Sequence, residues 1–275
     1  MLYLVVIGLC LTFAHRPYWW MHKNAGSLRM GLACKSALVA ASAALPLVTV
    51  CVVTAAFCAF IDKMSFADIG LRTDLRPGAA LGTGIVVAFA TVSLVFITGY
   101  LKGWFHVSST RLSSDFCKKL PLFCGGVSDF VNASIFEEII MRGYVFTVLY
   151  RDVGPVPAVL GSAAAFSVSH LVTHMRLPAM FTINAFLFGM LVAQSRLVTG
   201  AIWMPIGLHI GWNVAAATVF GLPLAGRVYN GGLLTCSVEG PEWFTGGYYS
   251  PDAGLLGTMA LMFTASVLVI LKPLA

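Results

Sequence analysis

The sequence has little charge. Only 10% of its 275 residues are Asp, Glu, Lys or Arg, whereas 59% are hydrophobic and the mean hydropathy is +0.88. Soluble domains carry charge on about a quarter of their residues. A soluble core could not bury this much apolar surface, so the composition excludes an ordinary soluble protein and predicts a chain embedded in a lipid bilayer.

Paired cysteines and the motifs of common hydrolases are also absent. No two cysteines form a CxxC pair or show the spacing of a metal site, so they are interpreted as small apolar residues and not as a disulfide framework or a zinc site. The sequence contains neither the HExxH motif of zinc proteases nor the GxSxG motif of serine hydrolases. The seven cysteines are Cys10, Cys34, Cys51, Cys58, Cys117, Cys124 and Cys236.

The net charge of +6 does not indicate nucleic acid binding, because the basic residues lie in short loops between apolar runs. Such loops set the orientation of membrane proteins. If residues 15–35 face the cytoplasm, alternation of the spans places 102–126, 175–177 and 221–252 on the same side. That side then carries Arg16, Lys23, Arg29, Lys35, Lys102, Arg111, Lys118, Lys119, Arg176 and Arg227, and the opposite side carries Lys63, Arg72, Arg76, Arg151, Arg196 and Lys272.

Apolar stretches predict the fold class, an all-α polytopic transmembrane bundle of about eight helices. A membrane-crossing helix needs about 20 mainly apolar residues, and the dyad alternation of a β-barrel is absent. The first stretch is interpreted as a short span or an interfacial anchor, because it lacks the basic start and the cleavage motif of a signal peptide. The stretches are residues 2–14, 36–60, 79–101, 127–149, 156–174, 178–195, 199–220 and 253–271.

Two connections between these stretches are unusually long. Residues 102–126 mix serines, lysines and aromatics and are expected to lie along the membrane interface. Residues 221–252 are rich in glycine and aromatics. A long connection of this kind is either functional or re-entrant, or it is an ordered cap on the helix ends, and the sequence leaves these alternatives open.

Three charges inside one apolar stretch point to a site. The sequence FEEIIMRG places Glu137, Glu138 and Arg142 in the span 127–149. Glu138 and Arg142 are four residues apart and can pair on one helix face. Glu137 lies about 100° round the helix from Glu138, so the two glutamates are expected to have different roles.

Other polar residues follow in two later spans. FSVSH places Phe166 and His170 on one helix face, and HIGWN does the same for His209 and Asn213. Glu137 is predicted about ten residues, roughly 15 Å, from the cytoplasmic end of its helix. His170, His209 and Asn213 are placed in the same half of the bilayer. Glu137 and these three residues are therefore expected to line one conical cavity that opens to the cytoplasm.

This set of groups can support hydrolysis without a covalent nucleophile. A carboxylate beside a histidine can deprotonate a water, and a second histidine with an amide can stabilise an oxyanion. Each residue also has a structural interpretation. The glutamates can serve helix pairing, His170 can be a satisfied core histidine, and His209 with Asn213 can join helices by hydrogen bonds.

The three motifs EExxxR, FxxxH and HxxxN, in this order and each in an apolar span, resemble the CPBP family of CAAX proteases and bacteriocin-processing proteins. The segment EGPEWFTGGYYSPDAGLL resembles the region before the last helix of many bacterial members. The resemblance covers residues 127 to about 271. It divides the chain into N-terminal helices with an interfacial loop, residues 1–126, and a catalytic core, residues 127–275, within one integrated membrane domain.

The resemblance implies a glutamate-type intramembrane endopeptidase. Glu137 would be the general base, His170 would orient the water, and His209 with Asn213 would stabilise the oxyanion. The remaining motif residues would support the site, namely Glu138, Arg142 and Phe166.

No metal and no cofactor are implied. The expected partners are the lipid bilayer and a protein or peptide substrate, with or without a prenyl group, and no nucleic acid. A bacterial cytoplasmic membrane is the expected location. The sequence leaves the oligomeric state and the substrate open.

Three alternatives use the same residues differently. Intramembrane Glu, His and Arg can form a proton relay in a transporter. The absence of an inverted repeat argues against this alternative. A non-catalytic membrane partner or immunity protein, and a metal-dependent hydrolase using Glu137, His170 and His209, are the other two.

Overall fold

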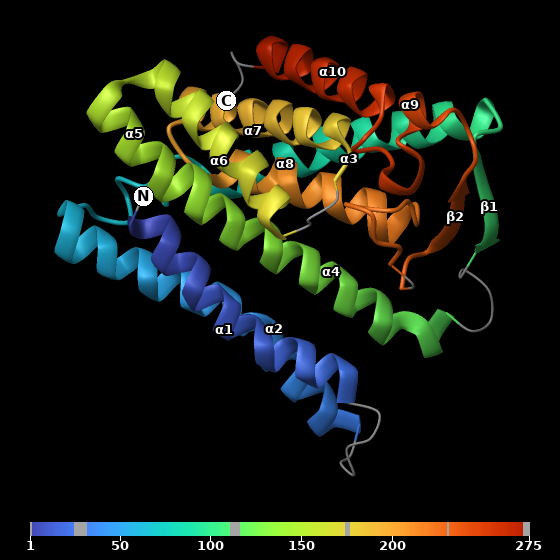
Figure 1. Cartoon of the computed structure of the whole chain (residues 1–275), viewed down its shortest axis with the longest axis horizontal. Coiled ribbons are helices and arrows are strands. Elements are labelled where there is room, and N and C mark those ends of the chain that lie inside the picture. Colours follow the sequence, from blue (N-terminus) through green and yellow to red (C-terminus); the bar gives the residue numbers. More distant parts are fainter. Residues whose placement is uncertain (1, 25–31, 111–115, 174–176, 230, 272–275) are drawn as a thin grey trace.

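The computed structural model describes residues 2–24, 32–110, 116–173, 177–229 and 231–271, and this part of the chain is mostly helical (Figure 1), which confirms the all-α class. The helices are α1 (Leu2–Asn24), α2 (Leu32–Ala56), α3 (Pro77–Leu101), α4 (Phe116–Glu138), α5 (Phe146–Val153), α6 (Pro155–Thr173), α7 (Ala179–Thr199), α8 (Trp203–Asn213), α9 (Glu242–Thr245) and α10 (Leu255–Leu271). Three segments have π-helical geometry, η1 (Phe57–Asp62), η2 (Ile139–Val145) and η3 (Val214–Val219), and η4 (Gly247–Tyr249) is a short 3-10 helix.

Each predicted apolar stretch falls on a helix, but the helix ends differ. The first helix continues beyond the predicted residue 14 to Asn24, and α4 begins at Phe116 instead of residue 127. From α4 the helical path continues through η2 into α5, which ends at Val153. Hydropathy detects the apolar part of a helix and not its polar ends, which explains the differences.

Several helices have the length and surface of membrane spans. Among the described residues, four helical stretches are long and apolar enough to cross a bilayer, and the predicted total of about eight spans stays a prediction. The chain is an integral membrane protein, and large apolar side chains on the outer faces of α3, α6 and α10 agree with contact to lipid tails. The four stretches are Ala44–Asp62, Pro77–Leu101, Pro155–Thr173 and Ala179–Thr199, and the exposed apolar residues include Val86, Leu94, Ile97, Val168, Val172, Met262, Phe263, Val269 and Ile270.

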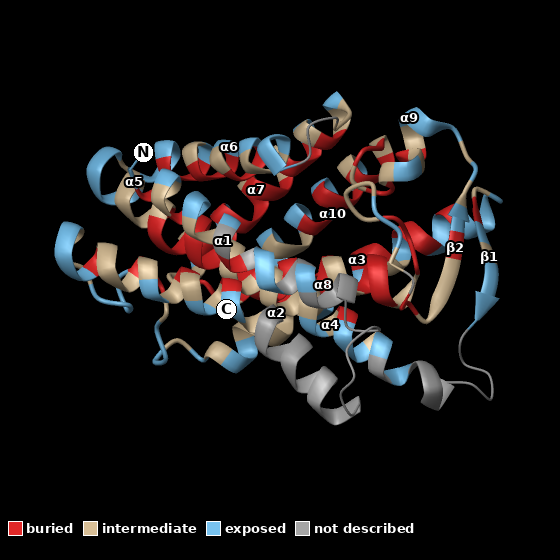
Figure 2. Ribbon diagram, turned by 60° about the horizontal axis from the view of Figure 1, so that its bottom comes forward, coloured by how far each residue is buried: buried red, intermediate tan, exposed pale blue. Residues whose placement is uncertain are grey.

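The helices pack around α7 and α8. Helix α3 packs on α8, α6 packs on α7, and α10 covers α3 and α7. Figure 1 shows α4 between the α1/α2 pair and the rest of the bundle. Buried residues gather along α7, α8 and the facing side of α3 (Figure 2), so the core lies between these helices.

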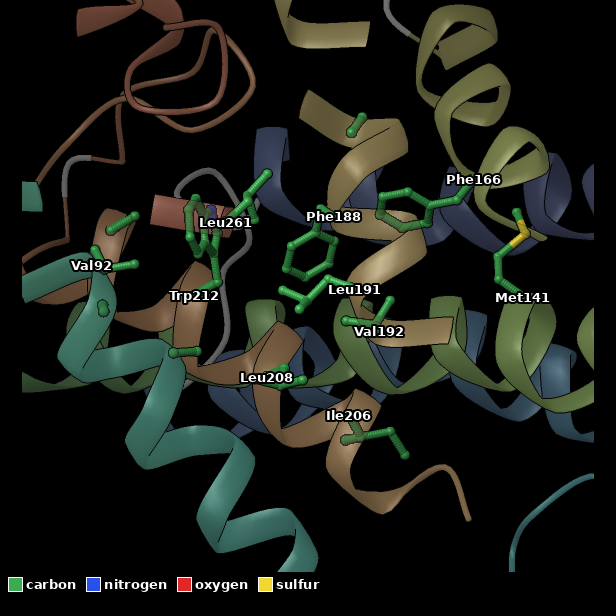
Figure 3. Packing of buried hydrophobic residues seen from close by; sticks show 14 of the residues in the cluster. Val92, Met141, Phe166, Phe188, Leu191, Val192, Ile206, Leu208, Trp212 and Leu261 are labelled. Atoms are coloured by element: carbon green, nitrogen blue, oxygen red, sulfur yellow. The ribbon is translucent and has the colours of Figure 1, made fainter. Parts of the chain in front are cut away.

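Aromatic side chains fill the centre of this core. Phe188 of α7 lies between Phe166 of α6 and Trp212 of α8, with ring centroids 5.9 and 6.0 Å away (Figure 3). Leu191 and Val192 extend the α7 side of the contact toward Leu208 (Figure 3). The polar residues of the motifs therefore project from helices that a tightly packed core fixes relative to one another.

Glycines allow α3 and α8 to approach closely. A Cβ on Gly207 would lie 2.2 Å from the carbonyl oxygen of Leu81, and a Cβ on Gly211 would lie 2.6 Å from that of Ile85. From the other side, a Cβ on Gly84 would lie 2.6 Å from the carbonyl oxygen of Met204. Gly207 and Gly211 form a GxxxG pair, the small-residue spacing that brings membrane helices into backbone contact.

Contacts at the two ends of the bundle agree with the predicted alternation of the spans. Strand β1 (Phe105–Thr110) pairs antiparallel with β2 (Leu234–Val238), so the two long connections meet at one end. At the other end, Asp62 pairs with Arg151, with N and O 2.9 Å apart, and the Ile202 N–H donates to the Gly70 carbonyl. Within the connection 102–126, Trp104 and Phe105 pack against the core next to Gly240 and Gly99, and the expectation that this connection lies along the membrane interface stays a prediction.

Candidate active site

The FEEIIMRG motif places a buried ion pair at the end of α4. The side chains of Glu138 and Arg142 are both fully buried, and Arg142 Nη1 donates to Glu138 Oε1 at 3.2 Å. Arg142 Nη2 donates to the Gly189 carbonyl at 3.1 Å, and its guanidinium lies 4.6 Å from the centre of the Phe166 ring. The pairing expected from the spacing of four residues is confirmed, and it ties α4 to α6 and α7.

A change of helix geometry follows the glutamates directly. Segment η2 begins at Ile139, the residue after Glu138, and η3 begins at Val214, the residue after Asn213. Such π turns are rare and often occur at functional sites, because they change the direction in which neighbouring side chains point. Hydropathy carries no signal for them, so the sequence did not predict them.

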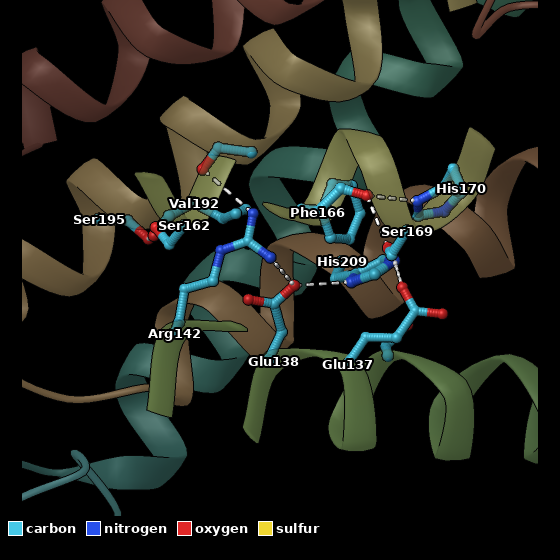
Figure 4. Close-up of polar contacts among 12 residues, drawn as sticks. Glu137, Glu138, Arg142, Ser162, Phe166, Ser169, His170, Val192, Ser195 and His209 are labelled. Carbon is cyan, nitrogen blue, oxygen red and sulfur yellow. Dashed lines mark hydrogen bonds and ion pairs between the residues drawn. The ribbon is translucent and has the colours of Figure 1, made fainter. Parts of the chain in front are cut away.

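His209 lies between the two glutamates (Figure 4). Its Nδ1 is 2.8 Å from Glu138 Oε1, and its Nε2 is 3.9 Å from Glu137 Oε2. The Glu138 carboxylate can only accept in this contact, so Nδ1 carries the proton and Nε2 is directed toward Glu137.

The two carboxylates differ as their rotation around the helix predicts. The side chain of Glu137 is 28% exposed, whereas that of Glu138 is fully buried. Glu138 is held by Arg142 and His209, and Glu137 has only the longer contact to His209 among the described residues. The more accessible carboxylate is therefore the one with room for a further partner.

His170 joins the site through Phe166. Its Nδ1 is 2.9 Å from the Phe166 carbonyl oxygen, so this nitrogen donates and Nε2 is left as an acceptor. The Phe166 ring contacts His170 at 4.6 Å and His209 at 5.8 Å between centroids. Within the described residues His170 makes no hydrogen bond to either glutamate, so Phe166 connects the two histidines while His170 and Glu137 remain separate.

Asn213 reaches α4 through a serine. Its Nδ2 donates to Ser134 Oγ at 3.4 Å, and Ser134 is fully buried one turn before Glu137. Asn213 is thus near the glutamates and on the same face of α8 as His209. Sequence analysis assigned Ser134 no part in the site, because a serine inside an apolar helix is uninformative without its neighbour on another helix.

Asp252 is a further, partly buried acid that sequence analysis missed. Its Oδ1 accepts from Trp212 Nε1 at 3.0 Å, and its Oδ2 accepts from the Ala225 backbone N–H at 3.3 Å. Burial raises the pKa of the Asp252 carboxyl to about 6, against the opposing effect of these two donors and of His170 and His209. The residue ends the connection 221–252, so that connection is packed against the motif helices and is not a detached loop.

The next feature is the arrangement of side chains that could bind a metal ion. Where the structure describes the chain, no three His, Cys, Asp or Glu side chains come together as ligands would. The expectation of a site without metal stays a prediction, because the arrangement of these side chains does not test whether the reaction uses a metal ion.

Comparison with known proteins gives one result. The model of the family described as Rce1-like, type II CAAX prenyl endopeptidase Rce1-like, matches residues 119–215. No match was found among curated proteins or among solved structures. The matched segment runs from α4 into η3 and includes all three motifs, although it is shorter than the resemblance over residues 127 to about 271. Residues 119–215 of this chain are therefore similar to the Rce1-like type II CAAX prenyl endopeptidases.

Proposed function

We propose that this protein is an intramembrane endopeptidase in which Glu137 activates water for attack on a peptide bond. The observation that carries the proposal is the position of His209 between a buried, ion-paired Glu138 and a partly exposed Glu137. The 3.9 Å from His209 Nε2 to Glu137 Oε2 exceeds a direct hydrogen bond, and polar groups at such distances are often bridged by one water.

In the proposed reaction Glu137 takes a proton from water, and the oxygen of that water attacks the carbonyl carbon of the scissile bond. Negative charge then develops on the carbonyl oxygen. His209 Nε2–H and the Asn213 amide would donate to it, since the Asn213 amide has a second N–H besides the one directed at Ser134. Glu137 would then return its proton to the leaving nitrogen as the C–N bond breaks, and the new carboxylic acid passes its proton to the amine, so the products are a carboxylate and an ammonium group.

The supporting residues have defined tasks in this proposal. Donation by His209 through both nitrogens requires an imidazolium, and the carboxylate of Glu138 at 2.8 Å favours that charge. Arg142 holds Glu138 in place from the other side. His170 donates through Nδ1 to the Phe166 carbonyl, so its Nε2 is the group that would accept from the attacking water and orient it.

The proposed substrate is a membrane-associated protein or peptide, with a prenylated CAAX-type C-terminus as the first candidate. The proposed site faces a water-accessible conical cavity on the cytoplasmic side of a bacterial membrane. Partial exposure of Glu137 supports access of water to the base. We propose no cofactor.

The test compares purified wild type with Glu137→Gln in detergent. Both are incubated with prenylated and unprenylated peptides, with and without a chelator, and cleavage is measured by mass spectrometry. We expect E137Q to lose activity by on the order of 10²–10⁴-fold, because it removes the general base. Wild-type cleavage that survives chelation is expected.

A matched control is Glu242→Gln, the same change at an exposed position of α9. It should cleave as wild type does. Full cleavage by folded E137Q would overturn the proposal. Glu137-dependent solute uptake in proteoliposomes without peptide cleavage would favour a transporter, and chelator-sensitive cleavage would favour a metal-dependent hydrolase.

A further inference from the structure

We propose that Asp252 is a positioning residue for the reaction, which fixes the rotation of α8 through Trp212 and thereby holds His209 and Asn213 in register with Glu137. This inference rests on the proposed function. Asp252 lies outside residues 119–215 and outside the three motifs, so neither the family match nor the motif pattern assigns it a role.

Asp252 is bound on three sides. Its carboxylate accepts from Trp212 of α8 at 3.0 Å and from the backbone of Ala225 at 3.3 Å. Its carbonyl oxygen accepts from Asn184 Nδ2 of α7 at 2.9 Å. The same Asn184 amide donates to Gly254 at 3.0 Å and accepts from Thr258 of α10 at 2.7 Å. Asp252 is therefore itself fixed by α7 and the start of α10, so it is a rigid point of attachment for α8.

Trp212 links this attachment to the proposed reacting groups. It stands one residue before Asn213 and three residues after His209 in HIGWN. Its ring lies 6.0 Å from Phe188, and the Phe188 ring lies 5.2 Å from that of His209. Loss of the Trp212 hydrogen bond would remove one restraint on the rotation of α8, and a small rotation moves His209 and Asn213 together because they share a helix face.

The choice of a carboxylate fits this role. Both partners of the side chain are N–H donors, and an ionised carboxylate offers only acceptors. An asparagine would direct its NH2 group at one of the two donors and lose that bond. The titratable groups that face Asp252 are His170 of α6 and His209 of α8, and both favour its charged form. The acid is thus arranged to hold α8 most firmly when it is ionised.

The first arm of the test measures kcat and KM for Asp252→Asn, Trp212→Phe and the double variant. We expect each single variant to lower kcat by on the order of 10–100-fold, as small misplacements of reacting groups do, with KM changed less than about twofold. The double variant should be no slower than the worse single variant, because both changes remove one contact. Asp152→Asn, an exposed acid paired with Arg151, is the matched control and should behave as wild type.

The second arm needs no activity. The indole ¹H–¹⁵N resonance of Trp212 is assigned by its loss in W212F and followed against pH in wild type and in D252N. With a carboxyl pKa of about 6, the resonance should shift as Asp252 ionises between about pH 5 and pH 7, and this inflection should vanish in D252N. An inflection that remains in D252N does not come from Asp252, so the comparison of the two titrations identifies its source.

The outcomes distinguish this inference from the proposed function. Losses in the two single variants that add in the double variant, or a Trp212 resonance that titrates identically in D252N, would overturn the positioning role. Full activity of E137Q would instead overturn the proposed function, and the resonance of Trp212 would still report whether Asp252 holds α8. A fall in thermal stability of D252N with unchanged kcat would show a purely structural contact.

Discussion

At the scale of single residues, the unusual feature is a buried cluster in which the Glu138 carboxylate is balanced by Arg142 and also contacts His209. Glu138 and Arg142 are fully buried, and His209 adds a third group to the same oxygen, Glu138 Oε1. A buried charge without its partner is costly, so each member depends on the others. Glu137, the residue before Glu138, lies outside the ion pair and is accessible to a further partner.

Replacing only one member of the pair should therefore destabilise the protein strongly. We expect Arg142→Met to lower the free energy of unfolding by about 3–5 kcal/mol, because Glu138 is left buried and charged. Thermal unfolding in detergent measures the effect. The double variant Glu138→Gln/Arg142→Met should recover part of the loss, and a double variant no more stable than R142M would contradict this explanation.

At the scale of helices, the backbone contact between α3 and α8 positions His209. Gly207 and Gly211 flank His209 on α8, and a side chain at either would collide with α3 carbonyl oxygens. The histidine can approach α4 only while α8 stays seated against α3. The packing of α8 against α3 therefore determines where His209 lies relative to α4.

We expect Gly207→Val to reduce both thermal stability and peptide cleavage, since its Cβ would lie 2.2 Å from the Leu81 carbonyl oxygen and the helices must separate. The matched control is Gly82→Ala on α3, where a Cβ meets nothing within 4 Å. That change should be neutral or stabilising by roughly 0.5–1 kcal/mol, because alanine favours helix over glycine. Equal behaviour of the two variants would contradict the close-approach argument.

The helices also show what sequence patterns can and cannot predict. Apolar length predicted the helices well, because the bilayer requires it, and the spacing of four residues predicted the Glu138–Arg142 pair. The π turns after Glu138 and Asn213 were not predictable from hydropathy. The contact of His209 with both glutamates depends on how α4 and α8 are rotated relative to each other, and Asp252 acts from a connection that looked like a loop. Such contacts between distant segments leave no local pattern.

At the scale of the whole molecule, connections pair at each end of the bundle. The β1–β2 ribbon joins residues 105–110 to 234–238, and at the other end the Asp62–Arg151 pair joins η1 to α5. The structure thus fixes which connections share an end, and the excess of basic residues predicts that the β1–β2 end faces the cytoplasm.

This orientation predicts opposite labelling of two exposed lysine positions. Lys102→Cys should react with an impermeant thiol reagent only from the cytoplasmic side, and Lys63→Cys only from the other side. Each is placed in a variant whose native cysteines are replaced, because Cys124 is exposed near the β1–β2 end. Labelling is measured in spheroplasts and in inverted vesicles. Reaction of both cysteines from the same side would contradict the alternation, and the reverse pattern would invert the orientation.

The contact of α8 with α3 also bears on which part of this chain could be transferred into another protein. The segment that the family model matches, residues 119–215, includes α8 but not α3. Without α3, this segment would expose the α8 surface at Gly207 and Gly211, and α8, which carries His209, would lose its α3 contact. The smallest transplantable unit is therefore discontinuous in sequence, and a chimera that inherits the motifs must inherit the α3 surface with them.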